Sequence, residues 1–336
     1  MRIAVYAPNL SCYNQSIMNR RQFIGGLVAA SSLPILSKDN PSVFHERGTW
    51  ERLALNYIHI NIGALKPFSV LHISDTHLTS ANPDEPAVKQ TLCESRTRCF
   101  GGRQEEALRD SLAWARDNAD YVIHTGDLID WQSNANFDIV KKCFGEKVIG
   151  SMGNHEFSPS MWLSDPKETN DEANKLRSRD LLASVYPFNL SFQSTIIHGV
   201  NFVTLDDSYG SVTEEQVACF KKELEKGYPI ILCMHVPFMS PEIWRARHKY
   251  WMGAKWNRTS MKFTSAEVPA PDDEYKIQLE DPVTRGFIAY LKTEKLLRGI
   301  LTGHLHFTMQ DRFSPTANQY IVGGNFMFLG QEVLFT

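Results

Sequence analysis

The chain lacks an apolar run of the ~20 residues that a membrane-spanning helix needs, so it does not have the sequence of a polytopic membrane protein. It also lacks an excess of basic charge, because 35 Lys and Arg residues face 38 Asp and Glu residues, for a net charge of −3. A protein dedicated to nucleic acid needs basic side chains to neutralise phosphates, so no nucleic-acid partner is expected. Internal repeats, low-complexity linkers and Cys-x-x-C motifs are absent too, and the last absence argues against zinc-finger and thioredoxin-type chemistry.

The composition is that of an ordinary globular protein, because 43% of the 336 residues are hydrophobic and 22% are charged. That length allows one large domain or two small ones, with ample core in either case. After residue 50, short apolar runs alternate with stretches at helical spacing, which predicts an α/β fold with a mixed or parallel sheet covered on both faces. Strands are expected at 57–62, 68–73, 121–124, 147–152, 201–205, 229–234, 299–302 and 320–322, and helices at 104–118, 177–185, 214–226 (with Thr213 as N-cap) and 284–297.

The segment before residue 38 has the layout of a secretory signal. Arg20 and Arg21 precede a short, weakly apolar stretch with small residues, and residues 1–37 hold three Arg but no Asp or Glu. The Arg-Arg-x-Phe-Ile core resembles a twin-arginine signal, except that Asn19 stands where Ser or Thr is usual. We therefore expect residues 1–37 to be a targeting segment; the alternative is a short helix of the mature fold.

Export would leave residues 38–336 as the mature chain, in the periplasm or another extracytoplasmic compartment, either free or in peripheral contact with a membrane surface. Translation starts at Met1 or at Met18 on this interpretation. A twin-arginine signal directs folded proteins, so the export machinery for folded proteins is an expected partner.

Cysteine is sparse, and its distribution bears on disulfide formation. The chain has six cysteines, of which Cys12 precedes the apolar stretch of the targeting segment, so processing would leave five. In an oxidising compartment, Cys93 and Cys99 are the pair expected to form a disulfide.

Five of the predicted strands are followed at once by polar residues that can bind a metal ion. Carboxyl ends of strands in an α/β sheet meet in one crevice, where such folds bind ligands, so these residues are expected to converge. The set contains carboxylates, an amide and imidazoles but no thiolate, which suits Mn, Fe or Zn. In chain order the seven residues are Asp75, His77, Asp127, Asn154, His235, His304 and His306.

Seven ligands are too many for one tetrahedral ion. They suit two divalent or trivalent ions about 4 Å apart that share a bridging carboxylate and a bridging water. Asp127 stands centrally in the set and is the expected bridge. The neighbouring glycines would let backbone approach the ions and adopt dihedral angles closed to other residues. Each motif alone is weak, but five of them in order predict a dinuclear centre.

The ordered set D-x-H, G-D, G-N-H-E, H and G-H-x-H resembles the calcineurin-like metallophosphoesterase superfamily over roughly residues 57–325. The resemblance implies a four-layer αββα sandwich of mixed sheets within a domain spanning 38–336, with the metal site at the carboxyl ends of strands. It also implies catalytic roles for Asp127 and His155, in which a metal-bridging hydroxide attacks phosphorus and His155 assists the leaving oxygen. It would place the first ion on Asp75, His77, Asp127 and His306, and the second on Asp127, Asn154, His235 and His304.

Three features of the sequence bear on which branch of the family it resembles. Asp130 stands three residues after Asp127, where purple acid phosphatases have Tyr, so a coloured iron–tyrosinate site is not expected. Phe157 after Gly-Asn-His-Glu is shared with the family's 5′-nucleotidases. The segment that contains Asp75, residues 57–78, stands behind a twin-arginine-like signal and resembles the exported phosphodiesterase branch more closely than the nucleotidases.

We therefore expect a dinuclear metal-dependent hydrolase of phosphodiesters or phosphomonoesters, acting on a small molecule or a lipid headgroup. Within enzymes the alternative is a nucleotidase or pyrophosphatase. A noncatalytic interaction scaffold of the same fold would show eroded ligands, and a structural metal-binding domain would favour closed, fully ligated sites.

Several further residues admit two interpretations. His72 and His124, on strands before the first two motifs, either support the ligands or are ordinary buried histidines. Glu156 either orients His155 or caps a helix. Residues 240–283, rich in Trp, Tyr, Pro and charge, are either a substrate-side cap or a surface excursion whose tryptophans pack on the core.

Overall fold

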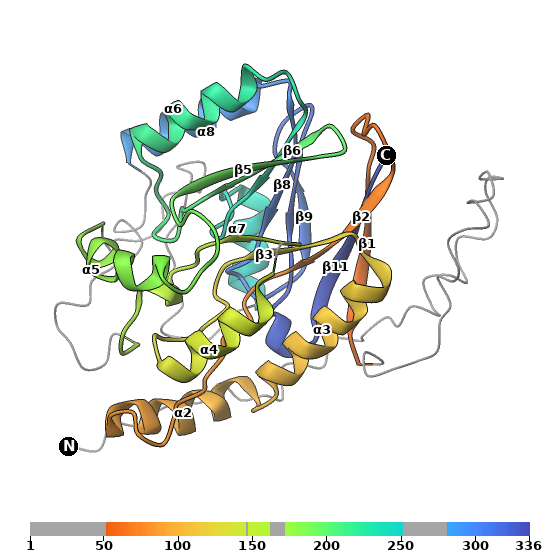
Figure 1. Ribbon diagram of the computed structural model, residues 1–336. Helices are drawn as coiled ribbons and strands as arrows, with labels where there is room; N and C mark the ends of the chain where they lie inside the picture. The colour runs from red at the N-terminus through yellow and green to blue at the C-terminus, as the bar shows by residue number, and fades with distance from the viewer. Residues whose placement is uncertain (1–51, 146, 162–171, 251–280) are drawn as a thin grey trace.

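The computed structural model describes residues 52–145, 147–161, 172–250 and 281–336 (Figure 1). The expected targeting segment 1–37 and most of the expected insertion, residues 251–280, lie outside the described residues. None of the helices in the described ranges combines the length and apolarity needed to cross a membrane.

Two mixed β-sheets form the centre of the molecule. The first has the order β1-β11-β2-β3-β4, with β11 antiparallel to β2 and the other neighbouring pairs parallel. The second has the order β5-β6-β7-β8-β10-β9, with only its two edge pairs antiparallel. The strands are β1 (Ala54–Ile60), β2 (Phe68–Ile73), β3 (Tyr121–Thr125), β4 (Val148–Ser151), β5 (Phe192–Ile197), β6 (Val200–Leu205), β7 (Ile230–Cys233), β8 (Leu297–Thr302), β9 (Met309–Arg312), β10 (Asn318–Ile321) and β11 (Leu329–Phe335).

Helices cover the outer faces of the two sheets (Figure 1). In the described part of the chain the α-helices are α2 (Ala87–Phe100), α3 (Gln104–Asn118), α4 (Asn134–Cys143), α5 (Glu172–Ala183), α6 (Glu214–Leu224), α7 (Pro241–Tyr250) and α8 (Pro282–Thr293), and there are short 3-10 helices η2 (His155–Phe157) and η5 (Asn325–Met327). The expected N-cap of α6 is confirmed: Thr213 accepts the Gln216 N–H, and the Gln216 side chain accepts the Thr213 N–H. Such a capping box supplies partners for otherwise unpaired helix N–H groups.

Three buried clusters separate the layers. Between the sheets, Val70, Ile123 and Val333 of the first pack with Phe202 and Ile231 of the second. Because successive side chains of a strand point to opposite faces, the residues next to these in sequence face the helices instead. The cluster on the first sheet's outer face is shared with α3 and α4, and the cluster on the second sheet's outer face with α6 and α8. The arrangement confirms the expected four-layer αββα sandwich of mixed sheets.

The element boundaries agree in part with the sequence pattern. β2 and α3 occupy the expected 68–73 and 104–118. β1 begins and ends earlier than the expected strand 57–62, and α8 ends at Thr293 because the chain enters β8 at Leu297. Among the α-helices and strands of the described residues, six have no expected counterpart, namely α2, α4, β5, α7, β9 and β11, and neither have the 3-10 helices η2 and η5.

The expected Cys93–Cys99 disulfide is wrong for this structure. Both residues lie in α2 and both are free thiols. Six residues of helix rise about 9 Å along the axis, which exceeds the Cα separation that a disulfide can span.

Candidate metal centre

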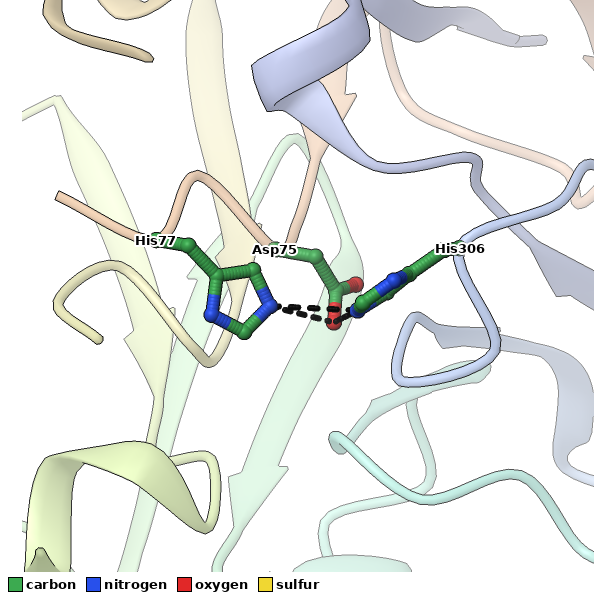
Figure 2. A group of neighbouring side chains, drawn as sticks. All are labelled: Asp75, His77 and His306. Atoms are coloured by element: carbon green, nitrogen blue, oxygen red, sulfur yellow. Dashed lines mark hydrogen bonds and ion pairs between the residues drawn. The ribbon is translucent and has the colours of Figure 1, made fainter. Parts of the chain in front are cut away.

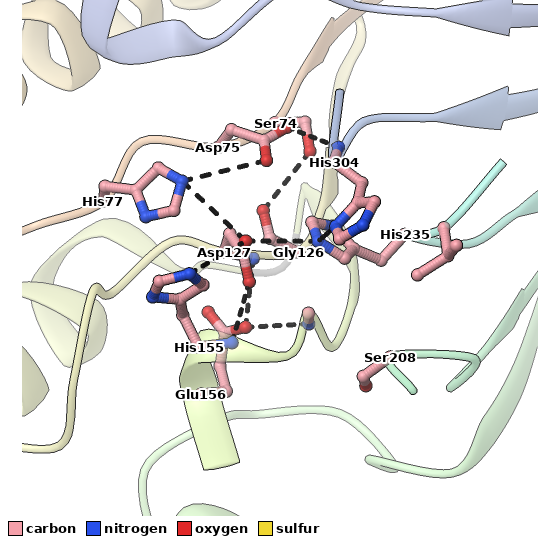
Figure 3. A network of polar contacts seen from close by, with 12 residues as sticks. Ser74, Asp75, His77, Gly126, Asp127, His155, Glu156, Ser208, His235 and His304 are labelled. Carbon is pink, nitrogen blue, oxygen red and sulfur yellow. Dashed lines mark hydrogen bonds and ion pairs between the residues drawn. The ribbon is translucent and has the colours of Figure 1, made fainter. Parts of the chain in front are cut away.

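The polar residues that follow the strands converge at the carboxyl ends of strands from both sheets. β2, β3 and β4 run parallel in one sheet, and β7 and β8 run parallel in the other, so the loops at their carboxyl ends meet where such folds have their ligand crevice. In Figure 3, Asp127 lies between His77 and His155 on one side and His235 and His304 on the other.

One group of side chains comes from the loops after β2 and β8. Asp75, His77 and His306 offer ligand atoms that all lie within 4.8 Å of one another. Figure 2 shows the Asp75 carboxylate between the two imidazoles, with Oδ1 3.3 Å from His306 Nε2 and 3.9 Å from His77 Nε2. The two Nε2 atoms are 3.1 Å apart, so both rings point to the same position.

A second group comes from the loops after β3, β7 and β8. Asp127, His235 and His304 again place their ligand atoms within 4.8 Å of one another. Asp127 Oδ2 lies 3.2 Å from His235 Nε2, whose other ring nitrogen donates to the Thr125 carbonyl at 2.7 Å. The same Oδ2 is 3.8 Å from His77 Nε2, so Asp127 lies between the two groups.

The backbone at these residues is held in an uncommon conformation. Asp75, His77, Asp127, His304 and His306 all have positive φ, between 51° and 66°. For an L-residue the left-handed region costs about 1–2 kcal/mol, and such strain persists only where the surroundings fix it. Positive dihedral angles were expected of the neighbouring glycines; only Gly126 has one, at 88°. Gly153 and Gly303 serve close approach instead, since an added Cβ would lie 2.2 Å from Asp127 Oδ1 and 1.9 Å from Ser74 Oγ, respectively.

Three buried polar atoms of this crevice fit a cation. Asp75 Oδ1, Asn154 Oδ1 and His304 Nε2 have no hydrogen-bond partner among the described residues. A buried polar atom left in this state costs about 1–3 kcal/mol, and a cation would remove that cost. Carboxylate, amide and imidazole donors without thiolate form a set that accepts Zn, Mn or Fe. The residues present therefore fit metal ions.

The protonation states of the buried carboxyl groups and of His304 also favour metal binding. Burial opposes ionisation of Asp127, but the neighbouring His235 and His155 hold the pKa of this carboxyl well below its usual range. Burial likewise opposes ionisation of Asp75, and contact with His306 lowers the pKa of that carboxyl. Burial and the nearby His235 lower the pKa of His304 to about 3. Ionised carboxylates and a neutral imidazole are the protonation states that bind metal. Against the effect of burial, Asp127 raises the pKa of His235 to about 10, so His235 would release a proton when it binds a metal ion.

Glu156 has neither of the two roles considered from the sequence. Its buried carboxylate accepts the backbone N–H groups of Asp127 at 3.0 Å and Leu128 at 2.7 Å, and that of Gly153 at 2.7 Å. The Tyr186 hydroxyl donates to it as well. Glu156 therefore fixes the Asp127 loop against the Gly153 loop rather than orienting His155 or capping a helix.

Asp130 is a site residue that the sequence alone distinguishes only by standing where purple acid phosphatases have Tyr. Its Oδ1 accepts from His77 Nδ1 at 2.9 Å and lies 3.1 Å from His155 Nδ1, while its backbone carbonyl accepts from His155 Nδ1 at 2.9 Å. Against the effect of burial, Arg96 and His155 hold the pKa of the Asp130 carboxyl well below its usual range. The only signal in the sequence is a second carboxylate three residues after Asp127.

His72 and His124 support the loops that carry the motifs. His72 Nε2 lies 3.0 Å from the hydroxyl of Thr125, and burial lowers the pKa of His72 to about 4. His124 Nε2 lies 3.0 Å from the hydroxyl of Thr76, the middle residue of Asp-x-His. The support role is thus the better description of both histidines.

The Thr76 contact belongs to a chain of hydrogen bonds with a defined direction. The Thr76 hydroxyl donates to Asn325 Oδ1 at 3.1 Å, so it accepts from His124 Nε2–H. Asn325 Nδ2 donates to Ser111 at 2.8 Å, and the Ser111 hydroxyl donates to the Ala107 carbonyl in α3. The Asp-x-His loop is therefore anchored to β3, η5 and α3.

The described part of the expected insertion 240–283 has one contact that fits a surface excursion and one that fits a substrate-side cap. Trp244 of α7 packs against the buried cluster that contains Ile243 and Phe307, as expected of a surface excursion. Tyr250, at the end of α7, donates its hydroxyl to the His306 carbonyl at 3.4 Å, which links the segment to the crevice.

A family model described as calcineurin-like phosphoesterase matches residues 68–307, more than two thirds of the chain. A comparison with curated protein sequences returned no match.

Solved structures of three phosphate-ester enzymes are similar to this chain. A dimetal phosphatase from Danio rerio is 15% identical, with a TM-score of 0.41, 77% of this chain and 88% of that chain covered. A 5′-nucleotidase from Candida albicans is 13% identical, with a TM-score of 0.36 and coverages of 81% and 47%. An NAD nucleotidase from Haemophilus influenzae is 13% identical, with a TM-score of 0.35 and coverages of 77% and 45%. On the family match, the chain belongs to the calcineurin-like phosphoesterases and is a metal-dependent phosphoric ester hydrolase.

Proposed function

We propose that this protein hydrolyses small phosphate monoesters or diesters at a dinuclear metal centre in the crevice. The observation that carries the proposal is the pair of ligand groups, each within 4.8 Å, that meet at Asp127. One ion would be held by Asp75, His77, Asp127 and His306, and the other by Asp127, Asn154, His235 and His304. When bound, such ions neutralise the charge of a phosphate ester and lower the pKa of water.

His155 would act on the leaving group. Its Nδ1 is engaged by the Asp130 carbonyl, so its Nε2 is the atom turned to the crevice, 4.0 Å from Asp127 Oδ2. Its side chain is 13% exposed, more than that of His77 or His235, so substrate can reach it. Against the effect of burial, Asp127 and Asp130 raise the pKa of His155 to about 9. A proton held at Nε2 could then pass to the leaving oxygen.

The proposal extends to the class of substrate. Nucleotides and lipid headgroups both present a phosphate ester to such a crevice, and so both are candidates. We propose a phosphodiester as the first choice, on the resemblance of residues 57–78 to exported phosphodiesterases. The role of residues 240–283 as a substrate-side cap remains part of this proposal.

We also propose export. The support is the sequence alone, namely Arg20 and Arg21 before an apolar stretch in a segment without acidic residues. Replacing both arginines by Lys should leave the precursor uncleaved inside the cell, whereas replacing Arg2 by Lys should not. Cell fractionation with an antibody measures the outcome, and equal export of all three chains would reject the twin-arginine interpretation.

The enzymatic proposal is tested on the purified full-length protein. Bound Mn, Fe and Zn are measured by mass spectrometry, and bis-p-nitrophenyl phosphate is compared with p-nitrophenyl phosphate as substrate after loading with Mn, Fe, Zn or Mg. The expected result is near two metal ions per chain and hydrolysis that Asp127→Ala abolishes. No bound metal and no hydrolysis under any loading would overturn the proposal.

A further inference from the structure

Helix α2 places a cation against the residue that orients two imidazoles of the crevice. Arg96 donates from Nε to Asp130 Oδ2 at 2.6 Å and from Nη2 to Asp130 Oδ1 at 3.0 Å. The Asp130 side chain is fully buried, and that of Arg96 is 24% exposed. A two-point contact of this kind fixes the carboxylate plane, which a single hydrogen bond does not.

Asp130, through its carboxylate and its backbone carbonyl, then determines which nitrogen of each imidazole faces the crevice. A carboxylate or carbonyl oxygen only accepts, so the Nδ1 atoms of His77 and His155 carry the protons that they donate to Asp130. Both Nε2 atoms consequently face Asp127, at 3.8 Å and 4.0 Å. The Asp130 carboxylate thus sets the tautomer of His77, and it also lies 3.1 Å from Nδ1 of His155, whose ring is directed by the Asp130 carbonyl as well.

A second residue of α2 supports the same ring. Phe100 stacks on His77 with centroids 4.4 Å apart and planes inclined by 12°, and the Arg96 guanidinium lies 5.0 Å from the Phe100 centroid. Arg96 and Phe100 are one helical turn apart, so α2 presents both to the site together. Leu92 is the only fully buried residue of α2. The contacts of Arg96 and Phe100 are therefore a large part of what holds this helix against the rest of the protein.

We propose that Arg96 is a positioning residue of this enzyme, which acts through Asp130 to keep Nε2 of His77 and of His155 directed into the crevice. The inference rests on the proposed function for its consequence in hydrolysis, but the orientation of the two rings can be measured without metal or substrate. Contacts of this kind behind metal-binding histidines typically account for a 10- to 100-fold change in metal affinity or activity.

The test compares Arg96→Gln and Arg96→Lys with Arg98→Gln, an exposed arginine of the same helix whose side chain donates to the Glu94 carbonyl. The full chain is labelled with ¹⁵N-histidine, and two-bond proton–nitrogen spectra of the metal-free protein identify the protonated nitrogen of each ring. Arg96→Gln should shift the His77 and His155 signals, Arg96→Lys should shift them less because the charge remains, and Arg98→Gln should leave them unchanged.

The activity readout is kept separate from this spectrum. In the metal-loaded protein, Arg96→Gln should lower kcat on the order of 10- to 100-fold, with partial recovery in Arg96→Lys. Millimolar guanidinium should restore part of kcat to Arg96→Ala, since it replaces the missing group. Unchanged ring signals in a folded Arg96→Gln or Arg96→Lys would overturn the inference, even if the melting temperature fell. If wild type hydrolysed no ester, the proposed function would fail while the spectra still decided the inference.

Discussion

The Glu156 carboxylate accepts the backbone N–H of Asp127 at 3.0 Å, so one strand-end motif holds the backbone of another. Asp127 has a φ of 53°, a conformation that needs such support. The same Oε2 also accepts the Gly153 N–H, which joins the loops after β3 and β4. The position of the central carboxylate therefore depends on a residue that does not face the crevice.

Glu156→Gln should destabilise the fold. A Gln side chain turns an NH₂ group toward backbone N–H groups that need an acceptor, so at least one buried N–H group loses its hydrogen bond. We expect a decrease of about 1.5–3 kcal/mol in the free energy of unfolding, measured by urea denaturation. The matched control is Glu105→Gln, where the exposed pair with Arg109 contributes roughly 0.3–0.5 kcal/mol. Equal stability of the two variants would contradict this role of Glu156.

His155→Ala and Asp127→Ala should separate turnover from metal binding. Loss of the His155 imidazole should lower kcat on the order of 10²- to 10⁴-fold, as loss of a general acid does, with metal content near that of wild type. Loss of the Asp127 carboxylate should remove both metal and activity, because it lies between the two ligand groups. Metal analysis and kinetics on the same preparations provide the measurement. A fully active His155→Ala would show that the assigned role is wrong.

Thr76→Val should weaken the site without touching a ligand. Val keeps the shape of the Thr side chain but leaves His124 Nε2–H and Asn325 Oδ1, both buried, without their hydrogen-bond partner. The expected loss is about 1–3 kcal/mol of stability, with a lower affinity for metal because Asp75 and His77 flank this position. Thr76→Ser retains the hydroxyl and should stay within about 1 kcal/mol of wild type. The variants are compared by Zn titration of the metal-free proteins and by urea denaturation. Equal zinc affinity and equal stability of Thr76→Val and Thr76→Ser would show that the chain of hydrogen bonds through Thr76 does not support the site.

The elements that the sequence predicts well are those with a strong local pattern. β2 is a continuous apolar run, and α3 buries Leu108, Trp114 and Ala115 at helical spacing. The elements it does not predict lack such a pattern or depend on distant residues. α2 buries only Leu92, and β9, with the sequence MQDR, has little apolar surface. β11 was missed because its insertion between β1 and β2 is a non-local pairing.

The sequence likewise predicts some residues of the site and not others. Strand-end motifs identify the residues that converge, since each stands next to its own apolar strand. They do not identify Arg96, because its contact with Asp130 spans 34 positions and α2 is itself not apparent in the sequence. Nor do they indicate the positive φ of Asp75 and His77, which arises from backbone contacts between loops. Local pattern thus locates the ligands, and tertiary contacts determine how they are held.

Gly303 and Gly286 should respond in opposite directions to the same substitution. An added Cβ at Gly303 would lie 1.9 Å from Ser74 Oγ and 2.4 Å from Asp75 Oδ2, whereas one at Gly286, inside α8, meets no atom within 4 Å. Gly303→Ala must displace Ser74 or the Asp75 carboxylate, so we expect a loss of about 1–3 kcal/mol together with weaker metal binding. Gly286→Ala should gain about 0.5–1 kcal/mol, because Ala loses less backbone entropy in a helix.

Both glycine variants can be compared by urea denaturation and by zinc titration of the metal-free protein. The zinc affinity of Gly286→Ala should equal that of wild type, because α8 packs on the outer face of the second sheet. If Gly303→Ala matched wild type in stability and in zinc affinity, the loop after β8 would not approach the Asp75 loop as closely as the structure has it. The close approach of backbone to carboxylate is therefore testable without knowledge of the substrate.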